Sequence, residues 1–328
     1  MAGPLRFRYS TERWNEGRVR DQLLGPLDER FGARLEQPWF PAPDGYGARR
    51  LEMDNGDFAL FCWNGQDAYW LGNTETPQAL WRTEKYDFSE VPYAVSRWGE
   101  RELLARLELV DPWLTEYDHL AWFFLPVFLS KDGRDSTRDF FAEHSAGFPD
   151  ATPDEGLAFF DRALRTGMLD EHRYTMASKL GTSHGLDLGR MAATMGEFTV
   201  AKLLHDAGLE FEPEVQLDSG HALDFRVGDH LVEVTRPRPP TRRATGTAIG
   251  ALRETAGAKN SDQLRAHPDA TLFVDCSSFR DDEWAQIRGE KPSLSHEPTV
   301  VFRARPDGRV EGYHVGELPF DLDSVEWF

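Results

Sequence analysis

The chain has 328 residues, 40% of them hydrophobic, which is enough for two domains of ordinary size with buried cores. It carries 56 acidic and 37 basic residues, a formal net charge of −19, which argues against nucleic-acid binding through a general basic surface. Its two cysteines, Cys62 and Cys276, suggest neither a disulfide framework nor a zinc site. Without a signal sequence or an apolar run of about 18 residues, we expect a cytoplasmic protein with no membrane partner.

The N-terminal part, residues 1–150, is predicted to be an α+β domain. Residues 49–73 form three short strands separated by Asn55-Gly56 and Asn64-Gly65, which are favoured two-residue hairpin turns. Helices are predicted near 98–110 and 134–145. Eight of the ten tryptophans lie in this part, and we expect them to belong to its core rather than to stack on bases. The role of this domain stays open, with specificity or partner binding as candidates.

Two further segments follow in chain order. Residues 151–187 are predicted to be a helical connector, and residues 188–328 an α/β domain, because helices there alternate with short strands. The expected elements are a helix over 191–208, a strand, a hairpin, a helix within 247–268, a buried strand over 270–279 and a hairpin over 299–315.

The hairpin over 221–240 carries two carboxylates. A two-residue turn at Gly228-Asp229 places Phe225 opposite Val232 and Asp224 opposite Glu233. Like charges that face each other across two strands are destabilising, so a compensating group is required. Carboxylate oxygens suit Mg²⁺, or Mn²⁺, as that group. The alternative is a solvated hairpin face on which a neighbouring arginine neutralises one acid.

A third acid precedes the hairpin. Glu197 lies at the edge of the apolar face of the predicted helix over 191–208, which ends at Gly208. A carboxylate at a buried edge requires a partner, because an unpaired buried charge is costly. We therefore expect Glu197 to meet Asp224 and Glu233, unless its side chain simply reaches past a loop to solvent.

The segments GEFTVAKLL (196–204), LDF (223–225) and VEVT (232–235), followed by a helix, resemble the PD-(D/E)XK nuclease superfamily over residues 190–280. The resemblance implies a restriction-endonuclease-like α/β fold for the C-terminal domain. It also implies that Asp224, Glu233 and the carbonyl of Val234 hold the metal, and that Glu197 completes or orients the site. The full-length chain looks like an uncharacterised family of haloarchaeal proteins, a resemblance that supplies no function.

One position departs from the superfamily pattern. The lysine expected two residues after the second acid is replaced by Thr235, which cannot supply a cation. Members of the superfamily can supply this lysine from the next helix, and Lys259 and Gln263 lie on the stripe of that helix that should face the sheet. We therefore assign Lys259 to positioning the nucleophile and place Gln263 beside it. A lysine stem that merely crosses apolar surface to reach solvent is the alternative.

A stretch rich in arginine and proline follows the hairpin. From Thr235 to Arg253 inclusive there are five arginines and no acid. Arginine forks suit phosphate oxygens, so this segment is predicted to contact a nucleic-acid backbone. Pairing with surface acids is the alternative. The predicted contacts are Arg236, Arg238, Arg242 and Arg243.

These observations predict a Mg²⁺-dependent endo- or exonuclease that hydrolyses phosphodiester bonds, with DNA as the expected substrate, in a halophilic archaeon. The acidic, lysine-poor composition fits such a source, since a strongly acidic surface keeps a protein soluble in high salt. The alternative, favoured by Thr235, is a catalytically inactive nuclease-like fold that binds nucleic acid or protein. The oligomeric state is left open, with a homodimer among the options.

Overall fold

The computed structural model describes residues 6–72, 88–130, 134–180, 186–217, 220, 222–238, 246–261 and 263–328. It is a mixed α/β structure with two sheets, each in its own compact unit. Unit 1 comprises Met1–Glu116 and Phe124–Lys131, and unit 2 comprises Tyr117–Phe123 and Asp132–Phe328. The division passes through helix α4 (Asp118–Phe128). In the described ranges, no helix combines the length and the apolar composition needed to cross a bilayer.

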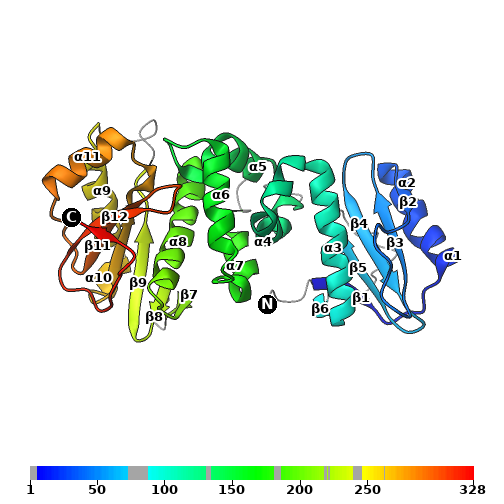
Figure 1. The fold of residues 1–328 in the computed structure, drawn as a ribbon. Coiled ribbons are helices and arrows are strands. Elements are labelled where there is room, and N and C mark those ends of the chain that lie inside the picture. The colour runs from blue at the N-terminus through cyan, green and yellow to red at the C-terminus, as the bar shows by residue number, and fades with distance from the viewer. Residues whose placement is uncertain are drawn as a thin grey trace. The chain divides into compact units, whose positions relative to one another are not determined.

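Unit 1 is built on an antiparallel sheet of order β2-β3-β4-β5-β1-β6 (Figure 1). The predicted strands and hairpins over 49–73 are confirmed as β3, β4 and β5. The strands are β1 (Arg6–Ser10), β2 (Arg34–Glu36), β3 (Gly47–Glu52), β4 (Phe58–Trp63), β5 (Ala68–Gly72) and β6 (Phe88–Glu90).

The tryptophans of the unit 1 sheet belong to a core, as predicted. Trp14, Trp63 and Trp70 are buried with Phe61, whose ring meets that of Trp14 edge-on. The helical segment that covers this face consists of α1 (Glu16–Arg18), a π-helical turn (Val19–Leu24) and α2 (Gly25–Phe31), and α3 (Tyr93–Val110) follows β6.

Unit 2 contains a seven-stranded mixed sheet of order β13-β12-β11-β10-β9-β8-β7. Strands β9, β10 and β11 are parallel, and β7, β8 and β12 are antiparallel to their inner neighbours. The strands are β7 (Phe211–Gln216), β8 (Ala222–Val227), β9 (His230–Thr235), β10 (Thr271–Asp275), β11 (Thr299–Ala304), β12 (Val310–Val315) and β13 (Glu326–Trp327).

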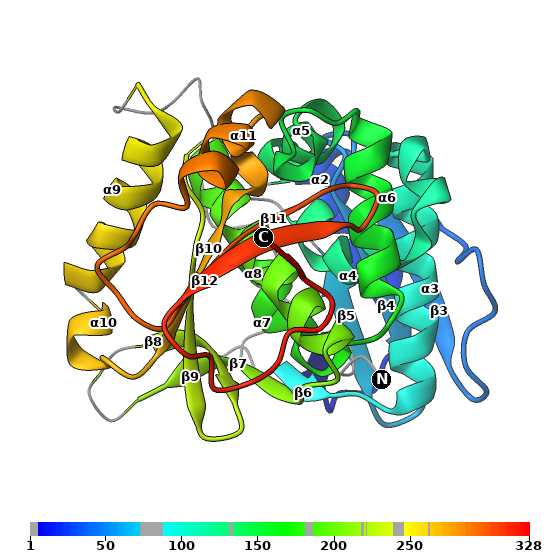
Figure 2. The same ribbon diagram turned by 60° about the vertical axis from the view of Figure 1, so that its left-hand side comes forward.

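Helices cover both faces of this sheet (Figures 1 and 2). Helix α8 (Leu188–Asp206) packs against β9 and β10. On the opposite face, Leu272 and Val274 of β10 pack with residues of α9 (Ala248–Ser261), α10 (Gln263–Ala266) and α11 (Asp281–Glu290). Apolar burial on both faces explains the near-continuous hydrophobic run of β10.

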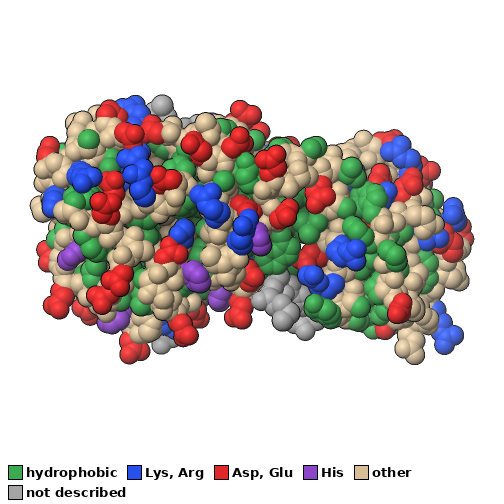
Figure 3. Space-filling view, viewed as in Figure 1, with side chains coloured by type: hydrophobic (Ala, Val, Ile, Leu, Met, Phe, Trp, Pro, Cys, Tyr) green, Lys and Arg blue, Asp and Glu red, His purple; other side chains and the backbone are tan. Residues whose placement is uncertain are grey.

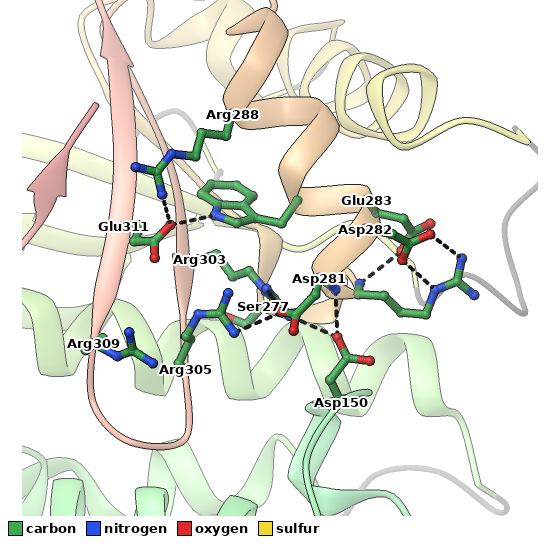
Figure 4. A network of polar contacts seen from close by, with 12 residues as sticks. Asp150, Ser277, Asp281, Asp282, Glu283, Arg288, Arg303, Arg305, Arg309 and Glu311 are labelled. Atoms are coloured by element: carbon green, nitrogen blue, oxygen red, sulfur yellow. Dashed lines mark hydrogen bonds and ion pairs between the residues drawn. The ribbon is translucent and has the colours of Figure 1, made fainter.

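The division into compact units differs from the boundary predicted near residue 150, because the helices after residue 132 lie in unit 2. These helices are α5 (Arg134–Glu143), α6 (Pro153–Leu164) and α7 (Arg173–Ser178). A polar network fixes the segment before α6 to the C-terminal hairpin (Figure 4). The buried Arg303 donates to Asp281 at 2.5 Å and to Asp150 at 3.2 Å, and Asp150 also accepts from the backbone N–H of Asp281. A sequence boundary drawn from loop composition could not detect these contacts.

Helix α6 begins with a capping box, in which Thr152 accepts from the N–H of Glu155 and Glu155 accepts from that of Thr152. Its first turn also carries Gly156, which lies against the backbone of Ser145. A Cβ atom at Gly156 would be 2.2 Å from the carbonyl oxygen of Ser145. The close approach of α6 to the preceding turn therefore depends on this glycine.

We expect Gly156→Ala to lower the free energy of unfolding by about 1–3 kcal/mol, the usual cost of overpacking. Helix propensity alone predicts a higher free energy of unfolding, since replacing glycine by alanine within a helix stabilises a protein by roughly 0.5–1 kcal/mol. Gly257→Ala in α9 is the matched control, because a Cβ there meets nothing within 4 Å. Equilibrium urea unfolding of both variants measures the two effects, and stabilisation by Gly156→Ala would contradict the packing described.

Candidate functional site

Three carboxylates from three different elements meet in unit 2. One oxygen each from Glu197 of α8, Glu214 of β7 and Asp224 of β8 lie within 4.8 Å of one another. Their side chains are 13%, 26% and 18% exposed, so the cluster is largely buried but open to solvent at one side. Such a set of hard oxygen atoms is suited to a divalent cation.

The sheet brings Glu214 and Asp224 together. The β7–β8 ladder pairs Pro213 with Phe225 and Val215 with Leu223, so Glu214 and Asp224 are opposed across the two strands. Opposed side chains have Cβ atoms about 4.5–5.5 Å apart. Glu214 also adopts a left-handed backbone conformation, with φ 59°, which is uncommon for a residue other than glycine. Backbone strain of this kind persists only where the surrounding structure enforces it.

The predicted hairpin register is confirmed next to the turn, but the ladder ends at Phe225–Val232 and does not include the predicted pair of Asp224 with Glu233. Phe225 pairs with Val232 and Val227 with His230, as the turn at 228–229 requires. At the next position the carboxylate of Asp224 accepts a hydrogen bond from the backbone N–H of Val234, at 2.7 Å. One oxygen of Asp224 is therefore fixed by the strand β9, while the other lies 3.8 Å from the ammonium of Lys179.

Glu233 and Lys259 form a pair beside this cluster. Glu233 is neighbour to Leu272 in the parallel β9–β10 ladder, on the face that α9 covers, and its side chain is 1% exposed. Oε1 of Glu233 is in an ion pair with Lys259 of α9, which confirms that Lys259 faces the sheet. Oε2 of Glu233 is buried and accepts no hydrogen bond. A buried carboxylate oxygen without a donor is costly, which makes it a candidate contact for a bound group.

A second lysine, which the sequence analysis did not identify, lies inside the cluster. Lys179, directly after α7, forms ion pairs with both Glu197 and Glu214 and lies near Asp224. Among the residues that the structure describes, the site therefore holds four carboxyl groups and two ammonium groups.

Because two ammonium groups cannot neutralise four carboxylates, the cluster favours protonation. Burial, together with the neighbouring Asp224, raises the pKa of Glu197 to about 8 and that of Glu233 to about 7, against the opposing effect of Lys179 and Lys259 respectively. Burial also raises the pKa of Asp224. Burial alone would lower the pKa of Lys179, but Glu197 and Asp224 outweigh it and raise that pKa to about 12. Raised carboxyl pKa values in a partly open cluster are typical of functional sites.

These pKa values predict the sign of a pH dependence. A carboxyl group whose pKa is raised by folding stabilises the folded state at low pH, and that contribution is lost as the pH rises through the folded pKa. In the presence of a chelator, we expect the free energy of unfolding to fall between about pH 5 and 8.5, by on the order of a few kcal/mol. Glu197→Gln should flatten this fall.

Glu212→Gln is the matched control for the pH measurement, because Glu212 pairs with Arg226 at the surface. Urea unfolding at several pH values compares the three proteins. Equal slopes for wild type and Glu197→Gln would contradict a raised pKa at Glu197.

The structure thus brings Glu197 and Asp224 together, as the sequence predicted, but the third acid within 4.8 Å is Glu214 rather than Glu233, which lies beside the cluster in its pair with Lys259. Lys179 is a further member that the sequence analysis did not identify. The alternation of FEPEVQ places Glu214 on the polar side of a strand, but nothing local pairs it with Asp224. Lys179 could have been noticed as one of only six lysines. The side chain of Gln263, the first residue of α10, lies outside what the structure describes, and metal binding by the carbonyl of Val234 stays a prediction.

Arg236 differs from its predicted role. Instead of a surface contact to nucleic acid, its guanidinium donates through Nε and Nη2 to Asp275, at 2.9 and 2.6 Å, and both side chains are 0% exposed. The arginine-rich composition suggested exposure, but the partner lies on the adjacent parallel strand, 39 residues later. Arg238 is exposed, and Arg242 and Arg243 lie outside the described residues.

Arg236→Met removes the charge and leaves the carboxylate of Asp275 buried. We expect the free energy of unfolding to fall by about 3–5 kcal/mol, as when one partner of a buried pair is removed. The double variant Arg236→Met with Asp275→Asn should recover much of this loss, because the amide oxygen can still accept from the N–H of Ser277. Urea unfolding of the full chain measures both; a loss below about 1 kcal/mol, the range of surface pairs, would contradict burial of the charge.

On the surface, basic side chains do not gather into a broad patch on the face shown in Figure 3. In unit 2 basic side chains pair with acidic ones, as Arg280 does with Asp282 and Arg288 with Glu311. Attraction of a polyanion to this face would therefore have to be local rather than general.

Comparison with known proteins places the chain in one family. Residues 2–322 match a family described as a family of unknown function (DUF5784), so the chain belongs to that family. No curated protein and no solved structure matched the sequence.

Proposed function

We propose that the protein is a divalent-metal-dependent nuclease that hydrolyses phosphodiester bonds, with DNA as its substrate and Mg²⁺ or Mn²⁺ as its metal. The observation that carries the proposal is the meeting of Glu197, Glu214 and Asp224, whose oxygens lie within 4.8 Å of one another. The adjacent Glu233–Lys259 pair adds a fourth acid and a cation to the same region.

The residues present fit such a metal in two respects. With all four carboxyl groups ionised and both lysines protonated, the formal charge of the cluster is −2, which one divalent cation neutralises. In addition, Oε2 of Glu233 is buried without a hydrogen-bond donor. Carboxylate oxygens are the preferred protein ligands of Mg²⁺, which retains several waters and shares the oxygens of a phosphate substrate.

Each residue of the cluster has a distinct role in the proposed reaction. Glu197, Glu214 and Asp224 hold the cation, and the N–H of Val234 keeps Asp224 in position. When bound, the cation supplies an acidified water and neutralises charge on the phosphate. Lys259, held by Glu233, lies beside the cluster, where it can position that water or bind a phosphate oxygen. It thus takes the place of the lysine that Thr235 replaces.

The order of elements supports the proposal. A helix with an acid (α8), a strand (β7), a hairpin with two acids (β8–β9), a helix (α9) and a parallel strand (β10) follow one another in the chain. This order is the one on which the resemblance to the PD-(D/E)XK superfamily rests. Glu214 is an additional acid that the resemblance did not imply.

The test is cleavage of single- and double-stranded DNA and of RNA by the purified protein with Mg²⁺ or Mn²⁺. We expect Asp224→Asn to lower the rate at least about 100-fold, since loss even of an outer partner of a metal site costs 10- to 100-fold. Asp229→Asn, in the exposed turn of the same hairpin, is the control and should keep the wild-type rate. Equal cleavage rates for wild type and Asp224→Asn, or cleavage that persists in the presence of a chelator, would contradict the proposal.

A second candidate function rests on Lys179. Its ammonium already pairs with Glu197 and Glu214, as a fixed internal cation would in a nuclease-like fold that has lost its metal. Such a protein would bind nucleic acid or another protein without cleaving it. Absence of both cleavage and divalent-metal binding, with retained DNA binding, would favour this candidate.

A further inference from the structure

Lys179 lies where a divalent cation would have to bind. Its Nζ atom forms ion pairs with Glu197 and Glu214 and lies 3.8 Å from Oδ1 of Asp224, so one ammonium contacts or approaches all three members of the cluster. Lys259 is different, because its ion pair is with Glu233, which is outside the group of three.

The geometry points to Lys179 as an exchangeable counter-ion: its ammonium holds Glu197, Glu214 and Asp224 together in the absence of a divalent cation, and a divalent cation displaces it. This inference rests on the proposed metal site. It concerns the state of the site before metal binds and the affinity with which metal is taken up.

The two cations exclude each other on steric and electrostatic grounds. Mg²⁺ binds carboxylate oxygens at about 2.0–2.1 Å, so it would occupy the space between the three carboxylates that the ammonium now shares. Two positive centres about 3 Å apart in a partly buried site repel each other strongly. The ammonium must therefore leave the oxygens that the metal takes.

Lys179 is placed so that its ammonium can move away from the three carboxylates. Its side chain is 22% exposed, it lies just beyond the end of α7, and its flexible four-carbon stem allows the ammonium to move without backbone rearrangement. A lysine with a purely structural role would instead be fully buried, as Arg236 is in its pair with Asp275, where both side chains are 0% exposed.

Competition of this kind lowers the apparent affinity for metal. The metal binds only the fraction of molecules whose carboxylates are free of the ammonium, so the observed dissociation constant rises by the reciprocal of that fraction. Removing the ammonium removes the competitor while leaving every proposed ligand in place.

The first test is calorimetric titration of the full chain with Mn²⁺. We expect Lys179→Met to bind Mn²⁺ at least tenfold more tightly than wild type, and to melt at a lower temperature than wild type only when a chelator is present. Lys202→Met is the control, because Lys202 pairs with Asp206 on the same helix as Glu197 but outside the cluster; its affinity should match that of wild type.

A second test needs no variant. Acetylation of wild-type protein by acetic anhydride, followed by mass spectrometry of the six lysines, reports how accessible each ammonium is. We expect Mg²⁺ to speed the acetylation of Lys179 severalfold and to leave Lys202 unchanged.

The outcomes separate the two proposals. If wild type binds Mn²⁺, and either Lys179→Met binds it equally or more weakly or Mg²⁺ leaves acetylation of Lys179 unchanged, the exchange is refuted and the metal site stands. If neither wild type nor Lys179→Met binds Mn²⁺, the metal site itself is refuted, and the exchange with it.

Discussion

The site in unit 2 depends on one electrostatic constraint, the excess of carboxylates over cations in a largely buried space. Glu214 and Asp224 are opposed across the β7–β8 ladder, and α8 adds Glu197 to them. Like charges so placed repel one another unless a cation or a proton offsets them. Lys179 and the backbone N–H of Val234 supply part of the compensation, and protons supply the rest. The fold therefore maintains a region that favours additional positive charge.

A buried ion pair lies next to this region. Arg236, directly after β9, and Asp275, at the end of β10, form a sealed pair that satisfies two guanidinium N–H groups. Helix α8 reaches this pair at Gly196, where a Cβ would lie 3.4 Å from Asp275 and 3.6 Å from Arg236. Gly196 immediately precedes Glu197. The buried pair thus helps to set how closely α8 approaches the sheet, and so where Glu197 lies relative to Asp224.

Local patterns in the sequence were sufficient for part of this site. The turn at 228–229 predicted the register of the hairpin as far as Phe225 and Val232. Helical periodicity predicted the buried edge for Glu197 and the sheet-facing side for Lys259. Contacts between distant elements were beyond local reasoning. The position of Glu214 depends on the pairing of β7 with β8 and on a left-handed backbone. Lys179 lies before residue 188, where the C-terminal domain was predicted to begin. The partner of Arg236 lies on another strand.

Two of the cation–carboxylate arrangements in unit 2 differ in how firmly the cation is held. Arg236 gives two N–H groups to one oxygen of Asp275 and is fully buried, so its charge cannot leave without a large penalty. Lys179 is shared among three carboxylates from three elements, is partly exposed, and has no bidentate geometry to hold it. The fold has therefore separated a fully buried arginine pair from a partly exposed lysine that is shared by opposed acids, as the proposed exchange requires. That separation favours the metal-binding interpretation over an inert fold, because an inert fold would have no need of acids that only a movable cation neutralises.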